Sequence, residues 1–327
     1  MKILITGISG FVARHFLEFL STTGEQYEVA GIYFRHTPTF NVNQFSNVTG
    51  NLYKTDLRDK DALTKILLDF DPGYILHLAS QSSVAYSWVH PAESIIENNS
   101  IFLNLMEQVR LLNLKCRILS VGSSEEYGNV NEAPLPLREE QCTTPVSPYG
   151  VSKVFQQILG HIYSLNYDLD IVRTRSFNHL GPYQTDNFVI SSFTKQLATQ
   201  LVKGEKKVKL TVGDMGVIRD FTDVRDVVKA YYLLLLNGKR GSIYNVCSHK
   251  GFILKDIIAM LEEISGTCIE LEIKESRFRP SENKKIIGSY DKIKNELGWQ
   301  PLIPMKQSLT DLLHYWMEEI KSRQLSA

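Results

Sequence analysis

The chain has 327 residues, of which 43% are hydrophobic, which is enough for one large or two interlocked folded domains. Lysine plus arginine and aspartate plus glutamate number 36 each, so no net charge favours nucleic acid or an anionic membrane. The first apolar run is too short for a signal peptide, and no run approaches the length of a membrane span. The 4 cysteines are scattered without a C-x-x-C pair, which argues against metal and disulfide roles. We therefore expect a cytoplasmic protein without a bound metal.

In the first half of the chain, short apolar runs alternate with amphipathic stretches. The apolar runs predict strands buried on both faces, at residues 2–6, 28–34, 74–78, 117–121 and 170–175. The stretches between them predict helices at 11–21, 60–69, 92–112 and 148–166, with Asp59 as an N-cap and Pro91 in a first turn. This alternation predicts an α/β fold with a doubly wound, parallel sheet of the Rossmann type.

Past about residue 176, loops that carry glycine, proline and asparagine separate the predicted elements. We expect helices at 188–202, 224–236, 253–264 and 305–320, and strands at 209–212, 242–246 and 269–273. This pattern predicts a smaller α/β lobe, with some segments returning to the first domain. The predicted first domain is 1–176, to which 213–248 partly return, and the second lobe is 177–212 with 249–327.

A glycine-rich turn joins the first predicted strand to the first predicted helix. Its sequence, Gly7-Ile8-Ser9-Gly10-Phe11-Val12-Ala13, is a G-x-x-G-x-x-A form of the dinucleotide fingerprint. Small residues let the backbone approach a pyrophosphate, and the helix N-terminus faces its charge. The alternative is an ordinary tight turn. We expect an NAD(P)(H) site that is contacted by Gly7, Ser9, Gly10, Phe11 and Val12.

Residues near later strand ends would complete this cofactor site. An acidic residue at the end of the second strand would favour NAD, but 32–36 offers none, and Arg35 could pair with a 2′-phosphate or be a solvated loop charge. The sequence therefore leaves NAD and NADP both open. Asp56 and Leu57 could meet the adenine edge, or Asp56 could be a turn acid. The small residues of Leu78-Ala79-Ser80 would let the nicotinamide half lie close.

Tyr149 and Lys153 lie four residues apart and therefore on one face of a predicted helix. A phenol has a pKa of about 10, so acid–base work near neutrality needs positive charge, which the Lys153 ammonium and the nicotinamide would supply. Lys153 would also hold the nicotinamide ribose, and Ser123, at a strand end, would hydrogen-bond the substrate oxygen. Asn98 could hold a proton-relay water or brace its helix. The alternative is that Tyr149 and Lys153 form an ordinary amphipathic helix surface.

Glu125 follows Ser123 by two residues and leaves the subtype of the reaction open. A carbonyl at sugar C4 acidifies the C5 proton. A carboxylate could remove that proton and assist loss of the C6 hydroxyl, which is the reaction of a dehydratase. A plain ketoreductase needs no such base, and Glu125 would then line the sugar pocket or bind neighbouring amides.

These residues resemble the extended short-chain dehydrogenase/reductase family, most of all its GDP-4-keto-6-deoxymannose reductases and GDP-mannose 4,6-dehydratases. The similar strings are Gly7/Gly10/Ala13, His77-Leu78-Ala79, Tyr149/Lys153, 176–182, 187–189, 212–214, 219–226, 244–248 and 279–282. The strings 178–182 and 219–223 look more like the reductases, whereas Glu125 looks like the dehydratases. Ala13, Ile101 and the loop 35–38 depart from the family pattern, and the last two leave NADP against NAD open.

The resemblance implies an NAD(P)-dependent oxidoreductase that acts at C4 of a GDP-linked sugar, as a reductase or a dehydrogenase. The alternatives are a GDP-mannose or GDP-heptose 4,6-dehydratase that uses Glu125 as base, and a non-catalytic NAD(P)-binding regulator. A forked guanidinium suits a diphosphate, although each arginine could equally form a surface ion pair. The implied partners are a GDP-sugar and further copies of the chain, in a homodimer or homotetramer packed through helices 92–112 and 148–166. The implied substrate contacts are Ser124, Asn178, Asn187, Val189, Arg219, Arg279 and Glu282.

Overall fold

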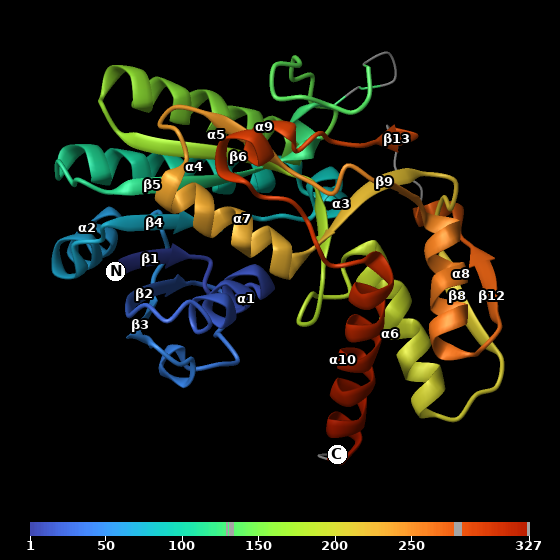
Figure 1. The fold of residues 1–327 in the computed structure, drawn as a ribbon. Helices are drawn as coiled ribbons and strands as arrows, with labels where there is room; N and C mark the ends of the chain where they lie inside the picture. Colours follow the sequence, from blue (N-terminus) through green and yellow to red (C-terminus); the bar gives the residue numbers. More distant parts are fainter. Residues whose placement is uncertain (129, 131–133, 278–282, 326–327) are drawn as a thin grey trace.

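The computed structural model describes residues 1–128, 130, 134–277 and 283–325. Figure 1 shows a central sheet covered by helices on both faces, with a second group of helices and short strands to one side of it. None of the described helices is long and apolar enough to cross a membrane.

The central sheet has 7 strands in the order β10-β6-β5-β4-β1-β2-β3, and every neighbouring pair is parallel. Its order reverses between β1 and β4, and in open α/β sheets ligands bind outside the carboxyl ends of the strands at such a point. The α/β fold class that the sequence predicts is therefore confirmed. The strands are β1 (Lys2–Thr6), β2 (Tyr27–Tyr33), β3 (Val48–Lys54), β4 (Tyr74–His77), β5 (Arg117–Ser123), β6 (Asp170–Ser176) and β10 (Ile243–Val246).

Two helical layers bury the two faces of this sheet. Apolar residues of α1 and α7, such as Phe16 and Tyr231, share one core with β1, and residues of α2, α4 and α5 share the opposite core with β4. Both helix starts that the sequence predicts are confirmed. Asp59 caps α2 by accepting from the Ala62 amide, and Pro91 is the first residue of α4. The helices are α1 (Phe11–Leu20), α2 (Lys60–Phe70), α3 (Val84–Val89), α4 (Pro91–Leu111), α5 (Pro148–Asn166) and α7 (Val224–Asn237).

The second group of elements has a core of its own, around Phe193, Leu261 and Leu309. Its sheets are the pair β8–β12 and a set in which β9 pairs with β7, β11 and β13. The strands are β7 (Asn178–Leu180), β8 (Val208–Val212), β9 (Ile218–Asp223), β11 (Gly251–Ile253), β12 (Ile269–Ile273) and β13 (Lys285–Ile286). Its helices are α6 (Val189–Val202), α8 (Leu254–Ser265) and α10 (Met305–Leu325), with the one-turn helix η3 (Glu275–Arg277). α9 (Asp291–Leu297) and the one-turn helices η1 (Val42–Gln44) and η2 (Ser124–Glu126) pack with the central sheet instead.

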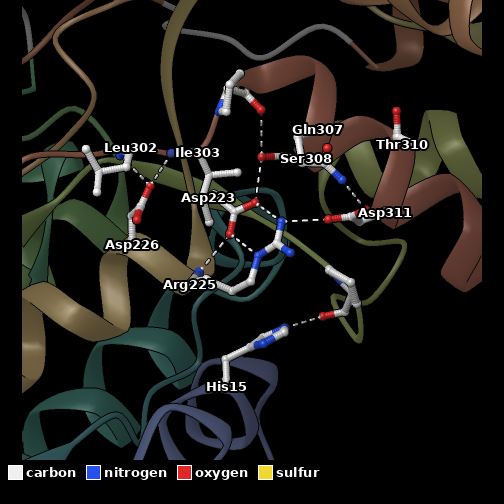
Figure 2. A network of polar contacts seen from close by, with 12 residues as sticks. His15, Asp223, Arg225, Asp226, Leu302, Ile303, Gln307, Ser308, Thr310 and Asp311 are labelled. Atoms are coloured by element: carbon white, nitrogen blue, oxygen red, sulfur yellow. Dashed lines mark hydrogen bonds and ion pairs between the residues drawn. The ribbon is translucent and has the colours of Figure 1, made fainter. Parts of the chain in front are cut away.

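A polar network ties the start of α7 to α10 (Figure 2). Asp223, at the end of β9, accepts from the guanidinium of Arg225 at 2.7 and 2.8 Å and from the Ser308 hydroxyl at 2.6 Å. The same guanidinium reaches Asp311 at 2.8 Å. Because Asp223 is almost fully buried, these contacts stabilise its charge and fix the corner between the two groups of elements.

Candidate active site

Gly7 makes the turn after β1 fold tightly against the end of β4. Its φ is +73°, and a Cβ at this position would lie 2.8 Å from the Ala79 nitrogen. The amides of Gly7 and Ile8 both donate to the Ile32 carbonyl, at 2.9 and 3.1 Å. Only glycine combines this φ with such a close approach, so the residue type is required by the geometry of the turn.

The turn leads into a helix start that can receive an anion. The N-cap of α1 is Gly10, and among the described residues no side chain caps this helix. Its first amides therefore point outward, together with the positive end of the helix dipole. Nearby in the fold, the Ser80 hydroxyl after β4 is buried and has no hydrogen-bond partner among the described residues. These open donors fit the pyrophosphate and ribose of a dinucleotide.

Arg35 and Asp56, which the sequence places at the adenosine end of the site, both have charged partners. The Arg35 guanidinium binds Glu97 at 2.5 Å and Glu93 at 3.5 Å, two residues of α4. Asp56 binds Arg58 at 2.6 Å, and this hydrogen-bonded ion pair holds the pKa of Asp56 below its ordinary value. The sequence does not predict these partners. Glu93 and Glu97 lie on α4, far from Arg35 in the chain, and Arg58 has no feature that sets it apart from other surface arginines.

Ser123, Tyr149 and Lys153 come together at the carboxyl end of β5. Lys153 is buried, and its ammonium donates to the Val121 carbonyl at 2.9 Å and to Gln156 at 3.1 Å. The same ammonium lies 5.7 Å from the centre of the Tyr149 ring. The Ser123 side chain lies near enough to Tyr149 to oppose the rise in the pKa of its phenol. The carboxyl end of β5 and the start of α5 thus bring a hydroxyl, a phenol and an ammonium to one place.

Burial dominates the ionisation of this cluster. It raises the pKa of Tyr149, an effect that the nearby Ser123 hydroxyl opposes and the charge of Glu125 reinforces. The protein without bound cofactor therefore does not show the lowered pKa of Tyr149 that the sequence predicts. Burial lowers the pKa of Lys153 to about 8, and burial together with the charge of Lys153 lowers the pKa of His77 to about 3.

Asn98 braces the helices around the site. Its Oδ1 accepts from the Gln81 amide at 2.7 Å, and its Nδ2 donates to the Ser152 hydroxyl at 3.0 Å. Asn98 and Ser152 are fully buried. Of the two roles that the sequence left open for Asn98, these contacts agree with bracing.

Glu125 and Glu126 follow Ser123 in sequence but lie in different environments. Glu125 is partly exposed, its amide donates to the Ser123 hydroxyl at 3.2 Å, and its carboxylate accepts from Ser147 at 3.5 Å. Glu126 is fully buried, and sequence reasoning gave it no role. Ser124, between Ser123 and Glu125, is buried as well.

Of the predicted substrate contacts, Ser124 lies at the end of β5, and the others that the structure describes lie in the segment from β7 to β9. Asn178, on β7, donates to the Asp220 carbonyl at 3.3 Å, and Arg219 is almost buried and donates to the Asn283 carbonyl at 2.8 Å. Asn187 is exposed and Val189 is the first residue of α6. Arg279 and Glu282 lie outside the described residues.

Comparison with known proteins yields relatives that match almost the whole chain. The sequence model of GDP-mannose 4,6 dehydratase matches residues 4–312. The GDP-6-deoxy-D-mannose reductase of Pseudomonas aeruginosa is 31% identical, over 98% of this chain and 98% of that protein. A GDP-mannose 4,6-dehydratase of Vibrio cholerae is 28% identical, over 100% of this chain and 95% of that protein. The solved structure of RMD from Pseudomonas aeruginosa complexed with NADPH has a TM-score of 0.84 at 31% identity, and covers 97% of this chain and 99% of that one.

Proposed function

This chain belongs to the GDP-mannose 4,6-dehydratase family, and from that membership we propose that it is an NAD(P)-dependent enzyme acting at C4 of a GDP-linked sugar. When bound, the nicotinamide would supply or accept the hydride. Tyr149 transfers the proton of the C4 hydroxyl, Lys153 holds positive charge beside it, and Ser123 orients the sugar oxygen. The convergence of these three side chains at the carboxyl end of β5 is the observation that carries the proposal.

We propose first that the enzyme reduces a 4-keto sugar. The same site could also run the reaction in reverse, as a dehydrogenase of a 4-hydroxy sugar. The Pseudomonas aeruginosa relative that is 31% identical over 98% of this chain is named as a reductase, which supports the direction of reduction. The test is to incubate the protein with GDP-4-keto-6-deoxymannose and NADPH or NADH, and to follow the nicotinamide absorbance. A reductase consumes the reduced cofactor only with the 4-keto sugar and leaves GDP-mannose unchanged. A dehydrogenase forms reduced cofactor stoichiometrically from a GDP-linked 4-hydroxy sugar.

A second candidate is a 4,6-dehydratase, which the position of Glu125 favours. This carboxylate lies in the same strand-end turn as Ser123 and is close enough to influence the charge of Tyr149. A dehydratase would convert GDP-mannose or a GDP-heptose to a 4-keto-6-deoxy product without net change in nicotinamide absorbance. Tight cofactor binding without turnover of any nucleotide sugar would instead support the non-catalytic regulator.

We further propose that residues 1–176, with part of 213–248, bind the dinucleotide, and that 177–212 with 249–327 bind the nucleotide sugar. The separate apolar cores around Phe16 and Phe193 support this division, except that Ile293 and Trp299 pack in the first of these cores. Within the second lobe, Asn178, Asn187, Val189, Arg219, Arg279 and Glu282 remain the proposed substrate contacts. The cytoplasm is the proposed location, because the described cysteines are free thiols that a reducing compartment would preserve.

Self-association through α4 and α5 is the final part of the proposal. Both helices carry large apolar side chains on their outward faces, with exposures of 61% for Ile96, 53% for Ile158 and 68% for Leu165. On α5 these residues recur every three to four positions and form one continuous stripe, at Val151, Phe155, Ile158, Ile162 and Leu165. A second copy would present the same α5 stripe, so two copies would bury their stripes against each other in a self-complementary interface.

The mass in solution tests this interface. We expect the wild-type protein to have at least twice the 37.3 kDa of one chain by light scattering. The double variant Ile158→Glu with Leu165→Glu would be monomeric, because two charges on the α5 stripe oppose its burial. Ile273→Glu, a matched substitution at another exposed isoleucine, would keep the wild-type mass. A monomeric wild-type protein would rule this interface out.

A further inference from the structure

Glu126 lies directly behind the strand end that carries Ser123. Its Oε1 accepts from the Ser123 backbone amide at 2.8 Å, and its Oε2 accepts from Nε of Arg175 at 3.2 Å. The side chain of Glu126 is fully buried and that of Arg175 almost so. Both oxygens act as acceptors, which is the arrangement of an ionised carboxylate.

The backbone of β5 leaves room for this carboxylate. Gly122 is paired in register with Arg175 of β6, and a Cβ at Gly122 would come within 2.2 Å of the Glu126 Oε1. Any larger residue at 122 would therefore displace the carboxylate from beneath Ser123. The position of the Glu126 carboxylate therefore requires glycine at residue 122.

Arg175 extends the contact to the helix that carries Tyr149 and Lys153. Its Nη2 donates to Gln157 on α5 at 2.9 Å, and its Nη1 donates to the Glu139 carbonyl at 3.1 Å. Its guanidinium also lies over the Tyr127 ring, 4.5 Å from the ring centre. A continuous polar chain therefore runs from Ser123 through Glu126 and Arg175 to α5.

Glu126 is also the charge that opposes the effect of burial on Lys153. Burial lowers the pKa of Lys153, and the negative charge of Glu126 raises it. The other titratable groups that face Lys153 are His77 on β4, which its low pKa keeps neutral, and Tyr149 on α5.

The surroundings of Glu126 itself are mainly cationic. Burial raises its pKa to about 7, and the charges of Arg175 and Lys153 oppose that rise. Arg173 lies two residues before Arg175 on β6, and the negative charge of Glu126 opposes the fall in its pKa that burial causes. Both oxygens of Glu126 accept hydrogen bonds, and its Oε1 binds the Ser123 amide, two residues from the Val121 carbonyl that accepts from Lys153, so an ionised Glu126 lies beside the Lys153 ammonium.

We propose that Glu126 is a positioning residue for this site: it fixes Ser123 through the backbone amide and supplies the buried negative charge that keeps Lys153 protonated. The inference rests on the proposed function for its catalytic meaning, but its geometric and electrostatic content concerns this chain alone. Two variants separate the two roles. Glu126→Gln removes the charge and retains an oxygen for the Ser123 amide, whereas Glu126→Asp retains the charge and is too short to reach that amide.

The titration of Lys153 is measured by NMR of the cofactor-free protein labelled with ¹³C at the lysine ε-carbon, with the signal assigned by its loss in Lys153→Arg. We expect a midpoint about one pH unit lower in Glu126→Gln and unchanged in Glu126→Asp. The matched control is Glu139→Gln, because Glu139 is another buried carboxylate of this wall and accepts from the Asn245 amide instead. Glu139→Gln would leave the Lys153 midpoint unchanged.

Turnover of the 4-keto sugar is measured with the same variants. Glu126→Asp would lower kcat by roughly ten- to a hundredfold at an unchanged Lys153 midpoint, because Ser123 loses its support. A wild-type Lys153 midpoint in Glu126→Gln, or a wild-type kcat in Glu126→Asp, would overturn the inference. If Glu126→Gln does not fold, the kcat of Glu126→Asp decides. A wild-type protein without turnover would overturn the proposed function, while the Lys153 midpoints would still report on the charge of Glu126.

Discussion

Asn98 on α4 donates a hydrogen bond of 3.0 Å to the Ser152 hydroxyl on α5. Ser152 in turn donates to the carbonyl of Tyr149 at 2.7 Å. Two helices that are far apart in sequence are thereby joined one turn from the proposed catalytic phenol. The contact fixes the helix rather than the reacting atoms, so its loss is expected to affect alignment and stability together.

Asn98→Ala is expected to lower the free energy of unfolding by about 2 kcal/mol, because it leaves the Gln81 amide and the Ser152 hydroxyl without this partner. It is also expected to lower kcat about tenfold through misalignment of α5. Urea unfolding and steady-state kinetics measure the two effects. The control is Gln108→Ala, a buried polar truncation on the same helix, whose amide oxygen accepts from Thr64 at 2.7 Å. Gln108→Ala would lose stability and keep kcat, and an equal loss of kcat in both variants would contradict a specific role for Asn98.

Tyr149→Phe is expected to lower turnover by about 10²- to 10⁴-fold, because it removes the hydroxyl that transfers the proton. Cofactor affinity, measured by quenching of protein fluorescence, would change little. Tyr163→Phe is the matched control on the same helix, since Tyr163 is also buried but binds Glu107 rather than the site. Full turnover in Tyr149→Phe would exclude the phenol from catalysis.

Glu125→Gln distinguishes the two proposed reactions. In a reductase, the variant is expected to keep NAD(P)H consumption with the 4-keto sugar within about tenfold of wild type, because no C5 proton is removed. In a dehydratase, it would abolish the conversion of GDP-mannose. Product analysis by mass spectrometry detects the loss of water directly. Glu140→Gln, at an exposed glutamate of the neighbouring loop, serves as the control.

His77 predicts a loss of stability in acid. Its folded-state pKa of about 3 is far below the ordinary value of 6.5, so only the unfolded chain takes up a proton between these values. Stability is therefore fully present above about pH 6.5 and falls as the pH decreases, by about 2 kcal/mol at pH 5 from this residue. His77→Asn keeps a nitrogen near the Thr6 hydroxyl, which lies 2.9 Å from His77 Nδ1, and does not titrate.

Urea unfolding near neutral pH and near pH 5 measures that difference. The loss between the two conditions would be about 2 kcal/mol smaller in His77→Asn than in wild type. His314→Asn, at an exposed histidine of α10, would keep the wild-type loss. The same acid loss in His77→Asn and wild type would show that another group is responsible.

The sequence predicts most of the first domain, because its inner strands are buried on both faces and therefore read as apolar runs. The edge strand β3 escaped this criterion, since Thr49, Asn51 and Lys54 interrupt its apolar residues. β9 escaped it for another reason. Its charged residues Arg219, Asp220 and Asp223 are buried, and Asp220 is held by Ser248, His249 and Gly288, so polar composition concealed a core strand.

In the candidate site, too, the sequence predicts what depends on local spacing and strand order. Spacing alone placed Tyr149 and Lys153 on one face, and the strand order brought Ser123 to them. Pairings between distant residues could not be read from the chain, such as Glu126 with Arg175, 49 positions away, or Arg35 with Glu97. The ionisation of Tyr149 was also beyond the sequence, because burial is a property of the folded protein.

The contacts of Asp223, Arg225 and Asp311 bear on how the two lobes could move when a ligand enters. In the proposed function, a nucleotide sugar held by the second lobe must meet the dinucleotide held by the first, and lobes move relative to each other by rotation about a few hinge positions. Asp223, Arg225 and Asp311 join β9, α7 and α10 at one corner (Figure 2). We therefore expect any opening of the lobes to pivot at this corner, with the widest displacement in the segments farthest from it.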